Sequence, residues 1–131
     1  MTRIMTHRTL KPSKSKYGNR KVKVDGYTFD SVAESNRYLE LKYMLLSGAI
    51  KDLQLQKKFV LDDGFRDNDG KWHREFTYVC DFYYYDNEKK DWIIEDVKSE
   101  ATAKDKVYRI KKRFMAKYGL TITEIRYGRR G

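Results

Sequence analysis

The stretch Tyr78–Lys98, YVCDFYYYDNEKKDWIIEDVK, decides the fold that we expect for this chain. Its pattern predicts two strands joined by a polar turn, with Asp81 near the middle of the first strand and Asp96-Val97-Lys98 at the end of the second. Uncompensated charge is costly among the Val, Ile, Phe and Tyr side chains of this stretch. A divalent metal ion would compensate the charge, so the stretch predicts a metal site.

The alternation of side chains along a strand decides which acid faces the predicted metal. Asp96 and Lys98 point the same way, whereas Glu95 points the other way. On the neighbouring antiparallel strand, Asp81 could lie across from the face that carries Asp96. Parity with Lys98 favours Asp96 as the ligand. A slip of the register by one residue would bring Glu95 to the metal instead, so both acids stay candidates.

The composition is that of one heavily charged, basic domain. The chain has 131 residues, of which 29 are Lys or Arg and 19 are Asp or Glu, so its formal net charge is +10. A small domain this basic usually binds a polyanion, and nucleic acid is the commonest one. Eleven Tyr and two Trp residues add candidate stacking surfaces.

The single cysteine, Cys80, excludes an internal disulfide and fits a reducing compartment. Its place beside Asp81 on an alternating strand predicts that it is a small core residue. No segment approaches the ~20 apolar residues of a membrane span, and no apolar stretch follows the basic N-terminal residues as in a secretory signal. We therefore expect a cytoplasmic protein without a membrane partner.

The N-terminal residues differ in composition from the rest of the chain. Residues 1–20 carry several Lys and Arg residues, no acid, the only proline and few apolar residues. This composition predicts a flexible basic arm, which either binds phosphates or is a solvated tail. Residues 21–131 are expected to form a single domain without internal repeats.

A hairpin and a helix open the domain. Lys21–Asp30 alternates apolar and polar residues on either side of Asp25-Gly26, a favoured two-residue turn. Ser31, with Glu34 three residues later, is a capping box that starts a helix, and Ser47-Gly48 ends it. The capping box also gives Glu34 a purely structural explanation. The predicted apolar stripe of this helix consists of Val32, Leu39, Tyr43 and Leu46.

Two further strands and a second helix are expected. Lys51–Leu61 predicts one strand, and Leu120–Tyr127 predicts the last strand. Between them, Thr102–Asp105 carries a second capping signal, which predicts a helix to about Tyr118. The predicted apolar side of this helix, expected in the core, consists of Val107, Ile110, Phe114 and Met115. Its candidate DNA-binding cations are Lys104, Lys106, Arg109, Lys111, Lys112 and Arg113.

The predicted order of elements is two strands, a helix, three strands, a helix and a last strand. This order indicates an α+β or α/β fold, with a mixed central sheet flanked by helices. Glu34 on the first helix could then reach the sheet edge that carries Asp81 and Asp96. Three carboxylates and a lysine suit phosphodiester hydrolysis, because oxygen ligands hold Mg²⁺ or Mn²⁺ and a lysine can orient water or stabilise negative charge.

The same residues also resemble a known family. Glu34 on a first helix, Asp81 on one strand and Asp96-x-Lys98 on the next resemble the PD-(D/E)xK nuclease superfamily, which includes type II restriction enzymes and archaeal Holliday junction resolvases. More closely, SVAESNRYLELKYMLLSGAIKDLQLQKKFVL, YVCDFYY and EDVKS are similar to a family of small phage and prophage proteins placed in that superfamily, the domain of unknown function 1064. The resemblance covers residues 17–127.

The resemblance implies a restriction-endonuclease-like fold and assigns roles to the site. The implied catalytic residues are Glu34, Asp81, Asp96 and Lys98. The three acids would be ligands of Mg²⁺ or Mn²⁺, with the Val97 carbonyl as a further ligand, and Lys98 would be the catalytic lysine. Lys111 would support the site or contact a phosphate. Cys80 and Ser99 depart from the commoner Pro and Gly, and Asp96 stands where Glu is commoner, but no departure removes a ligand.

The expected function is a metal-dependent, phage-type DNA endonuclease. Family analogy alone suggests a branched substrate such as a Holliday junction, cut by a homodimer. One alternative is a non-catalytic protein that binds DNA, or a host protein, on a nuclease fold. A single-strand exonuclease or nickase is the other.

Overall fold

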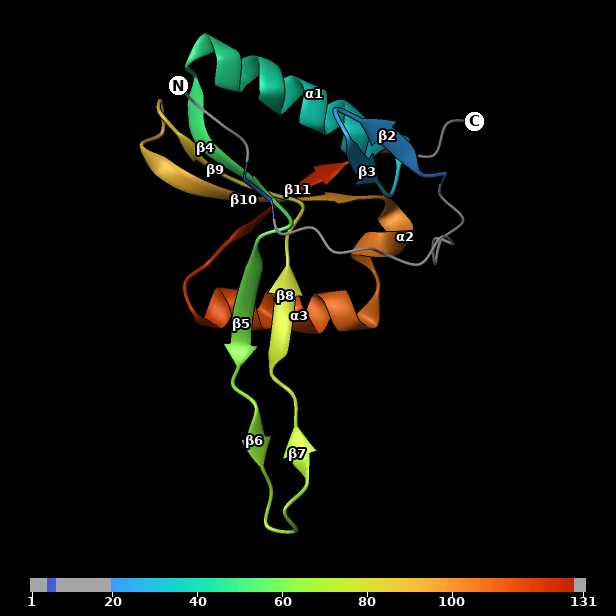
Figure 1. The fold of residues 1–131 in the computed structure, drawn as a ribbon, viewed down its shortest axis with the longest axis vertical. Coiled ribbons are helices and arrows are strands. Elements are labelled where there is room, and N and C mark those ends of the chain that lie inside the picture. The colour runs from blue at the N-terminus through green and yellow to red at the C-terminus, as the bar shows by residue number, and fades with distance from the viewer. Residues whose placement is uncertain (1–4, 7–19, 129–131) are drawn as a thin grey trace.

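A computed structural model describes residues 5–6 and 20–128, and its centre is a five-stranded sheet in the order β1-β4-β9-β10-β11 (Figure 1). The strands are β1 (Met5–Thr6), β4 (Ile50–Leu55), β9 (Phe82–Asp86), β10 (Asp91–Lys98) and β11 (Ile122–Arg126). β1 runs parallel to β4 and β10 parallel to β11, whereas β4, β9 and β10 are antiparallel neighbours. The sheet is therefore mixed, and the fold is α+β, as predicted.

One part of the expected N-terminal arm belongs to this sheet. Met5 and Thr6 pair with Gln54 and Leu55 at the edge of β4. At these two positions the predicted arm is thus paired with the sheet. Most of the predicted arm lies outside the described residues.

The hairpin and first helix form as local sequence chemistry predicts. β2 (Val22–Val24) and β3 (Tyr27–Phe29) are joined by Asp25-Gly26, whose φ angles of 53° and 82° are those of a tight hairpin turn. The helix α1 (Val32–Ser47) begins after Ser31, whose side chain accepts a hydrogen bond from the Glu34 N–H, and it ends at left-handed Gly48.

The face of α1 that the sequence predicted to be buried is exposed. Tyr43 and Leu46 have exposed fractions of 75% and 78%, and Val32 and Leu39 are also exposed. The buried residues of α1 are instead Glu34, Ser35, Tyr38, Leu41 and Leu45. The predicted stripe was wrong because the buried face has the same helical spacing and carries Tyr38, Leu41 and Leu45, so periodicity alone did not distinguish the two faces.

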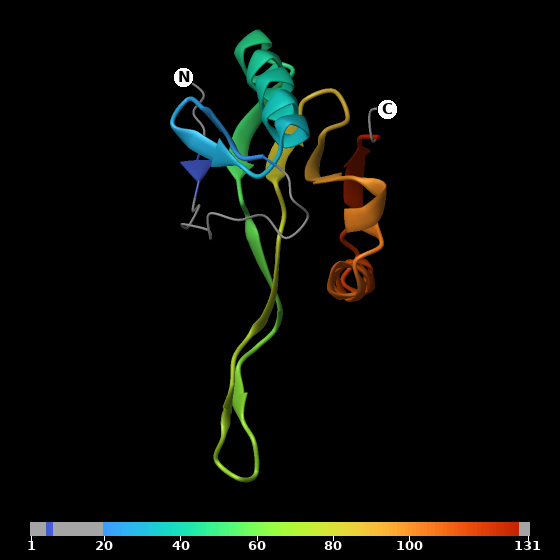
Figure 2. The ribbon, with the colours of Figure 1, turned by 90° about the vertical axis from the view of Figure 1, so that its right-hand side faces the viewer.

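The predicted strand Lys51–Leu61 is two strands. β4 ends before Gln56, which has a φ of 59°, and the chain continues as β5 (Lys58–Asp62). β5 pairs with β8 (Phe76–Val79), and beyond them β6 (Phe65–Arg66) pairs with β7 (Trp72–His73). These four strands form a long ribbon that projects from the sheet (Figures 1 and 2).

The second predicted helix is also divided. α2 (Glu100–Ala103) is capped by Ser99, and α3 (Lys106–Lys117) is capped by Asp105 rather than by Thr102. The predicted apolar side of α3 is wrong at Val107 and Ile110, which are exposed. Its buried residues are Tyr108 and Met115. Phe114 is half-buried, as its predicted core position implies.

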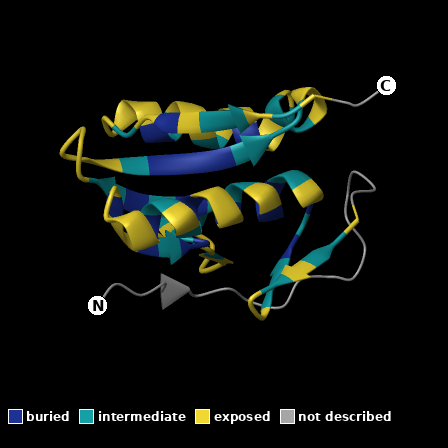
Figure 3. Ribbon diagram, turned by 90° about the horizontal axis from the view of Figure 1, so that it is seen from above, coloured by how far each residue is buried: buried dark blue, intermediate teal, exposed yellow. Residues whose placement is uncertain are grey.

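Two buried clusters hold the sheet between α1 and α3 (Figure 3). The first joins Phe29, Tyr38 and Leu41 to Leu53 and other residues on one face of the sheet. The second joins α3 to the opposite face and to the base of the ribbon, and it includes Leu61, Tyr78, Cys80, Ile94, Tyr108 and Met115. Cys80 is therefore a core residue, as predicted. No helix among residues 5–6 and 20–128 has the length and apolar character needed to span a bilayer.

A carboxylate and lysine site at the break between two strand pairs

Asp81 lies where the ribbon meets the sheet, between β8 and β9, and not in the middle of a strand as predicted. Its N–H donates to the Glu95 carbonyl at 3.1 Å, and its own carbonyl accepts from the Gln56 N–H at 3.1 Å. Its side-chain Oδ2 accepts from the Val97 N–H at 2.8 Å. These bonds hold the Asp81 carboxylate beside the end of β10, across from Asp96, as the antiparallel pairing predicted.

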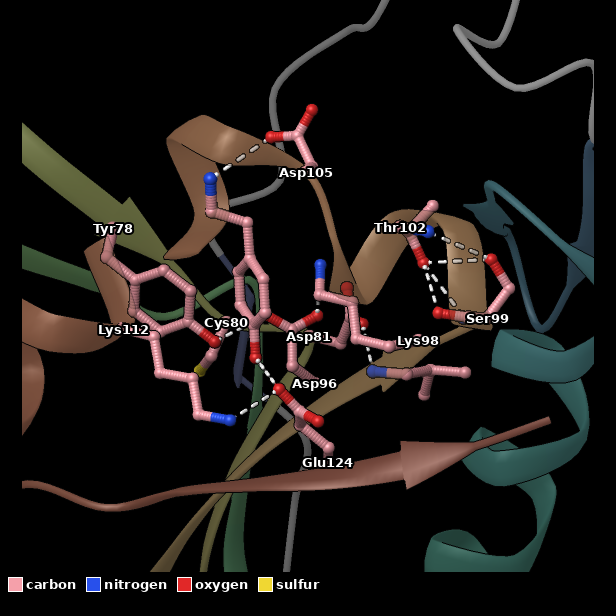
Figure 4. A network of polar contacts seen from close by, with 12 residues as sticks. Tyr78, Cys80, Asp81, Asp96, Lys98, Ser99, Thr102, Asp105, Lys112 and Glu124 are labelled. Carbon is pink, nitrogen blue, oxygen red and sulfur yellow. Dashed lines mark hydrogen bonds and ion pairs between the residues drawn. The ribbon is translucent and has the colours of Figure 1, made fainter. Parts of the chain in front are cut away.

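Asp96 and Lys98 share the face of β10 that is directed toward α3. The Tyr78 hydroxyl donates to Asp96 Oδ2 at 2.5 Å, and Lys98 Nζ lies 3.1 Å from Asp96 Oδ1 (Figure 4). Lys98 Nζ also lies 4.1 Å from the centre of the Tyr108 ring. Burial, and then the charge of Asp96, raises the pKa of Tyr78 far above its ordinary value, so this hydroxyl is a donor at any accessible pH.

Glu95 lies on the opposite face, where it is bound to α1. Arg37 Nε and Nη2 donate to the two Glu95 oxygens at 2.8 and 2.6 Å, and the Tyr84 hydroxyl also donates to Glu95. This forked ion pair fully engages the carboxylate. The register thus places Asp96 beside Lys98 on one face, as strand parity predicted, and gives Glu95 a structural partner on the other face.

Glu34 is buried near the N-terminus of α1, and part of its role is structural. Its N–H donates to Ser31 Oγ at 3.0 Å, and its Oε1 accepts from the Asp30 N–H at 3.1 Å. The carboxylate is also close enough to Asp81 to act on it. Burial, and then the negative charges of Glu34 and Asp96, raise the pKa of Asp81 well above its ordinary value.

The acids are close, but they do not form a ready-made coordination cluster. Among residues 5–6 and 20–128, no group of three or more His, Cys, Asp or Glu side chains is arranged to hold a metal ion. Each acid has a protein donor instead: Asp30 N–H on Glu34, Val97 N–H on Asp81, and Tyr78 with Lys98 on Asp96. Val97 contacts Asp81 through its N–H, and not through the carbonyl that the resemblance implies as a ligand.

A cavity of about 230 Å³ opens beside Asp96 and Lys98. Its lining includes Tyr78, Asp105, Tyr108 and Lys111. Lys111 is half-buried, with its Nζ 5.6 Å from the centre of the Phe76 ring. The cavity therefore brings one cation of α3 to the same hollow as the central acid and lysine, whereas Asp81 and Glu34 are not part of its lining.

The remaining candidate DNA-binding cations divide into paired and outward-facing groups. Lys112 Nζ lies 2.9 Å from Glu124, and Lys104 Nζ lies 3.9 Å from Glu100. Lys106, Arg109 and Arg113 are exposed along α3. Lys111 is the candidate on α3 that lines the cavity, with Val107 and Tyr108. Helical spacing places Lys106, Arg109 and Arg113 on the other side of α3, where they are exposed.

Tyr78, Tyr108 and Glu124 belong to the site but were not predicted. The Tyr108 hydroxyl donates to Glu124 Oε2 at 2.6 Å, and Glu124 pairs with Asp96 across β10 and β11 (Figure 4). Burial would raise the pKa of Glu124, but hydrogen bonds from Tyr108, Lys112 and Arg126 outweigh it and lower the pKa to about 2. Only the parallel pairing of β11 with β10 could have identified Glu124.

The fold and site define a small mixed α+β protein in which a broken strand pair brings carboxylates and a lysine together. The chain belongs to the family described as "Protein of unknown function (DUF1064)", whose model matches residues 14–127. This match confirms the closer of the two resemblances drawn from the sequence. No curated protein and no solved structure matches the chain.

Proposed function

We propose that the protein is a metal-dependent deoxyribonuclease of the PD-(D/E)xK type, with Asp81, Asp96 and Lys98 at its centre. One observation carries this proposal: the Asp81 carboxyl is buried near Glu34 and Asp96, and its burial, together with the charges of both acids, raises its pKa. A structural role alone gives little reason to gather like charges at the end of a strand, because each disfavours ionisation of the other. Such gatherings of perturbed acids are typical of functional sites.

The donor set suits a hard divalent cation. Glu34, Asp81 and Asp96 offer carboxylate oxygens, which Mg²⁺ and Mn²⁺ prefer, and the negative charge that raises the pKa of Asp81 is what a cation would offset. These three residues would hold the ion, and the bound ion would polarise a phosphate and activate water. Lys98, at 3.1 Å from Asp96, is placed to stabilise negative charge on the phosphate.

The basic surface supports DNA as the substrate. α3 carries six Lys and Arg residues, and one of them, Lys111, lines the cavity with Lys98. Phosphate contacts of this kind provide affinity without sequence preference. We extend the proposal to branched DNA as the preferred substrate and to a homodimer as the cutting unit, since paired cuts in a symmetric junction need two centres.

Labelled duplex, single-stranded and four-way-junction DNA, each incubated with Mg²⁺, with Mn²⁺ and with chelator, test this function. The wild-type protein should cut only when metal is present. Asp81→Asn and Lys98→Ala should each lower the rate by roughly 100- to 1,000-fold or more, the cost of removing a group that stabilises the transition state. DNA binding in chelator should persist in both variants.

Glu88→Gln and Lys89→Ala provide matched controls, because they remove an exposed acid and an exposed lysine from the β9–β10 turn. Both should cut as fast as the wild type. If the wild type binds DNA tightly but cuts none of the three substrates with either metal, the nuclease proposal is wrong and the non-catalytic DNA-binding alternative replaces it.

A further inference from the structure

Three aromatic side chains form a surface on the sheet face that carries Asp96 and Lys98. The Trp92 and Tyr83 rings are stacked, with centroids 4.8 Å apart and an interplanar angle of 12°. The Tyr85 ring meets Trp92 edge-on at 5.5 Å. Trp92 pairs with Tyr85 across β9 and β10, and Tyr83 pairs with Ile94 one step further along. We call Tyr83, Tyr85 and Trp92 the aromatic platform.

Strand parity places the platform on the same side as the proposed catalytic residues. Trp92, Ile94, Asp96 and Lys98 alternate along β10 and therefore share one face. Trp92 lies four residues from Asp96, which corresponds to roughly 13 Å along a strand, or about four base steps at 3.4 Å each. Ile94, between Trp92 and Asp96, is buried in the cluster beneath α3, so the platform and the proposed catalytic residues are separate parts of one face.

The platform is more exposed than a core cluster. α3 packs on β11 and β5, and Tyr83 is the platform residue that contacts the buried cluster beneath α3. Trp92 has an exposed fraction of 41%, and Tyr85 is half-buried. Aromatic pairs across strands stabilise sheets wherever they occur. A tryptophan with this exposed fraction, next to lysine side chains, is also suited to contact with a nucleic acid base.

The charge around the platform is complementary to a phosphate backbone. Lys51 Nζ lies 5.0 Å from the centre of the Tyr85 ring, and Lys57 Nζ lies 5.8 Å from the centre of the Tyr83 ring. The nearest acid on the same hairpin, Asp91, accepts a hydrogen bond from the Trp92 N–H at 2.8 Å. Aromatic planes for bases and ammonium groups for phosphates are the two parts of a single-strand binding surface.

We propose that the aromatic platform binds the bases of an unpaired DNA strand. The link to a cleaved substrate rests on the proposed nuclease function, but the binding does not. Duplex bases are already stacked on one another, so their flat faces are not available to Trp92. The preferred substrate is therefore DNA with a single-stranded segment at or near the cut, such as a flap or an opened junction arm.

The two tryptophans allow a direct test. Trp72→Phe removes the tryptophan at the ribbon tip and leaves Trp92 as the sole indole fluorophore. Titration of this variant with an oligothymidylate in chelator should quench the Trp92 emission, while a duplex of equal length should leave it unchanged. Absence of quenching at DNA concentrations that saturate binding would overturn the proposal, and so would equal quenching by duplex.

Substitution of the platform measures its contribution. Trp92→Ala should weaken oligothymidylate binding by roughly 5- to 150-fold, the usual effect of removing one stacking ring, while Trp92→Phe should retain most of the affinity. Trp72→Ala is the matched control, because Trp72 has a similar exposed fraction of 53% but lies on β7, and it should bind as the wild type does. Equal losses from Trp72→Ala and Trp92→Ala would contradict the assignment.

Further measurements separate the alternatives. Lys51→Gln, which leaves the rings in place, should reduce the slope of log affinity against log salt for single strands by about 0.7. An unchanged slope contradicts the proposal. So does a Trp92-dependent preference for RNA, in which oligouridylate binds more tightly than oligothymidylate. Trp92 emission that changes with protein concentration without DNA would instead identify an interface with a second copy.

The outcome is independent of cleavage, because all of these titrations are made in chelator. If the protein binds single strands through Trp92 but cuts nothing, the platform proposal stands and the nuclease proposal is wrong. If Trp92→Ala changes neither metal-dependent cutting nor single-strand affinity, the platform proposal is wrong and the nuclease proposal stands.

Discussion

α1 and α3 cover opposite faces of one sheet, yet they differ in charge. α1 carries two acids and two basic residues, so its side chains sum to zero, whereas α3 carries six cations and no acid. α1 brings a buried carboxylate, Glu34, toward the site, and α3 brings Lys111 to the cavity beside it. In the proposed function, this difference would divide the roles: α1 would support the acids and α3 would provide the polyanion-binding surface.

The two helices also share a feature that hydrophobicity does not predict. Each exposes apolar residues, such as Leu46 on α1 and Val107 on α3, and each turns a polar group toward the sheet. Arg37 of α1 reaches Glu95, and Tyr108 of α3 reaches Glu124. The same faces also bury apolar residues such as Leu41 of α1 and Met115 of α3, so polar contacts and apolar packing together set the orientation of both helices.

The largest expected effect is on the α1 side. Arg37→Ala leaves Glu95, which is 1% exposed, without its forked partner. Removal of one member of a buried ion pair costs about 3–5 kcal/mol, so the free energy of unfolding in denaturant should fall by that amount. Lys42→Ala, which removes an exposed ion pair with Asp25, should cost less than about 1 kcal/mol. Similar losses in the two variants would contradict the assigned role of Arg37.

On the α3 side, Glu124 should make stability depend on pH. Its pKa is about 2 in the folded protein against 4.5 as an ordinary value, so its contribution is fully present above pH 4.5 and is lost as the pH falls toward 2. The contribution should be about 2 kcal/mol, discounted for partial exposure. Thermal or denaturant unfolding should show that Glu124→Gln has a lower free energy of unfolding than the wild type at pH 7. This difference should vanish near pH 2. A difference that is constant with pH would refute this account.

DNA affinity should depend on α3 and not on α1. Arg109→Gln combined with Arg113→Gln should reduce the salt slope of duplex binding by about 1.8, since each phosphate contact contributes about 0.9. Lys42→Gln on α1 should leave the slope unchanged. Filter binding or anisotropy between 50 and 200 mM salt measures the slope for both variants. If Lys42→Gln lowers the slope as much as the α3 variant does, the proposed difference between the two helices is wrong.

The smallest effects are expected at the exposed apolar residues. Leu46→Ser on α1 and Val107→Ser on α3 should each change the free energy of unfolding by less than about 0.5 kcal/mol, as surface substitutions usually do. Leu41→Ala and Met115→Ala, on the buried faces of the same helices, should cost about 2–5 kcal/mol. If the serine variants are as destabilised as the alanine variants, the helices are oriented as the sequence first suggested.

Local features of the fold could be predicted because their causes lie within a few residues. The cap at Ser31, the left-handed stop at Gly48 and the Asp25-Gly26 turn need only neighbouring residues. The shared face of Asp96 and Lys98 likewise follows from the period of a strand. The breaks at Gln56 and Asp81 had no such signal, because they arise where one strand pair leaves the sheet to become the ribbon.

By itself, then, the sequence determined the mixed α+β class, the boundaries of the first helix, the parity of the acids and the basic character of α3. The tertiary structure alone decided which helix faces are buried, that Glu95 belongs to Arg37, and that Tyr78, Tyr108 and Glu124 surround the site. The physical reason is distance along the chain. Arg37 and Glu95 are 58 residues apart, so their pairing appears only when the helix is packed on the sheet.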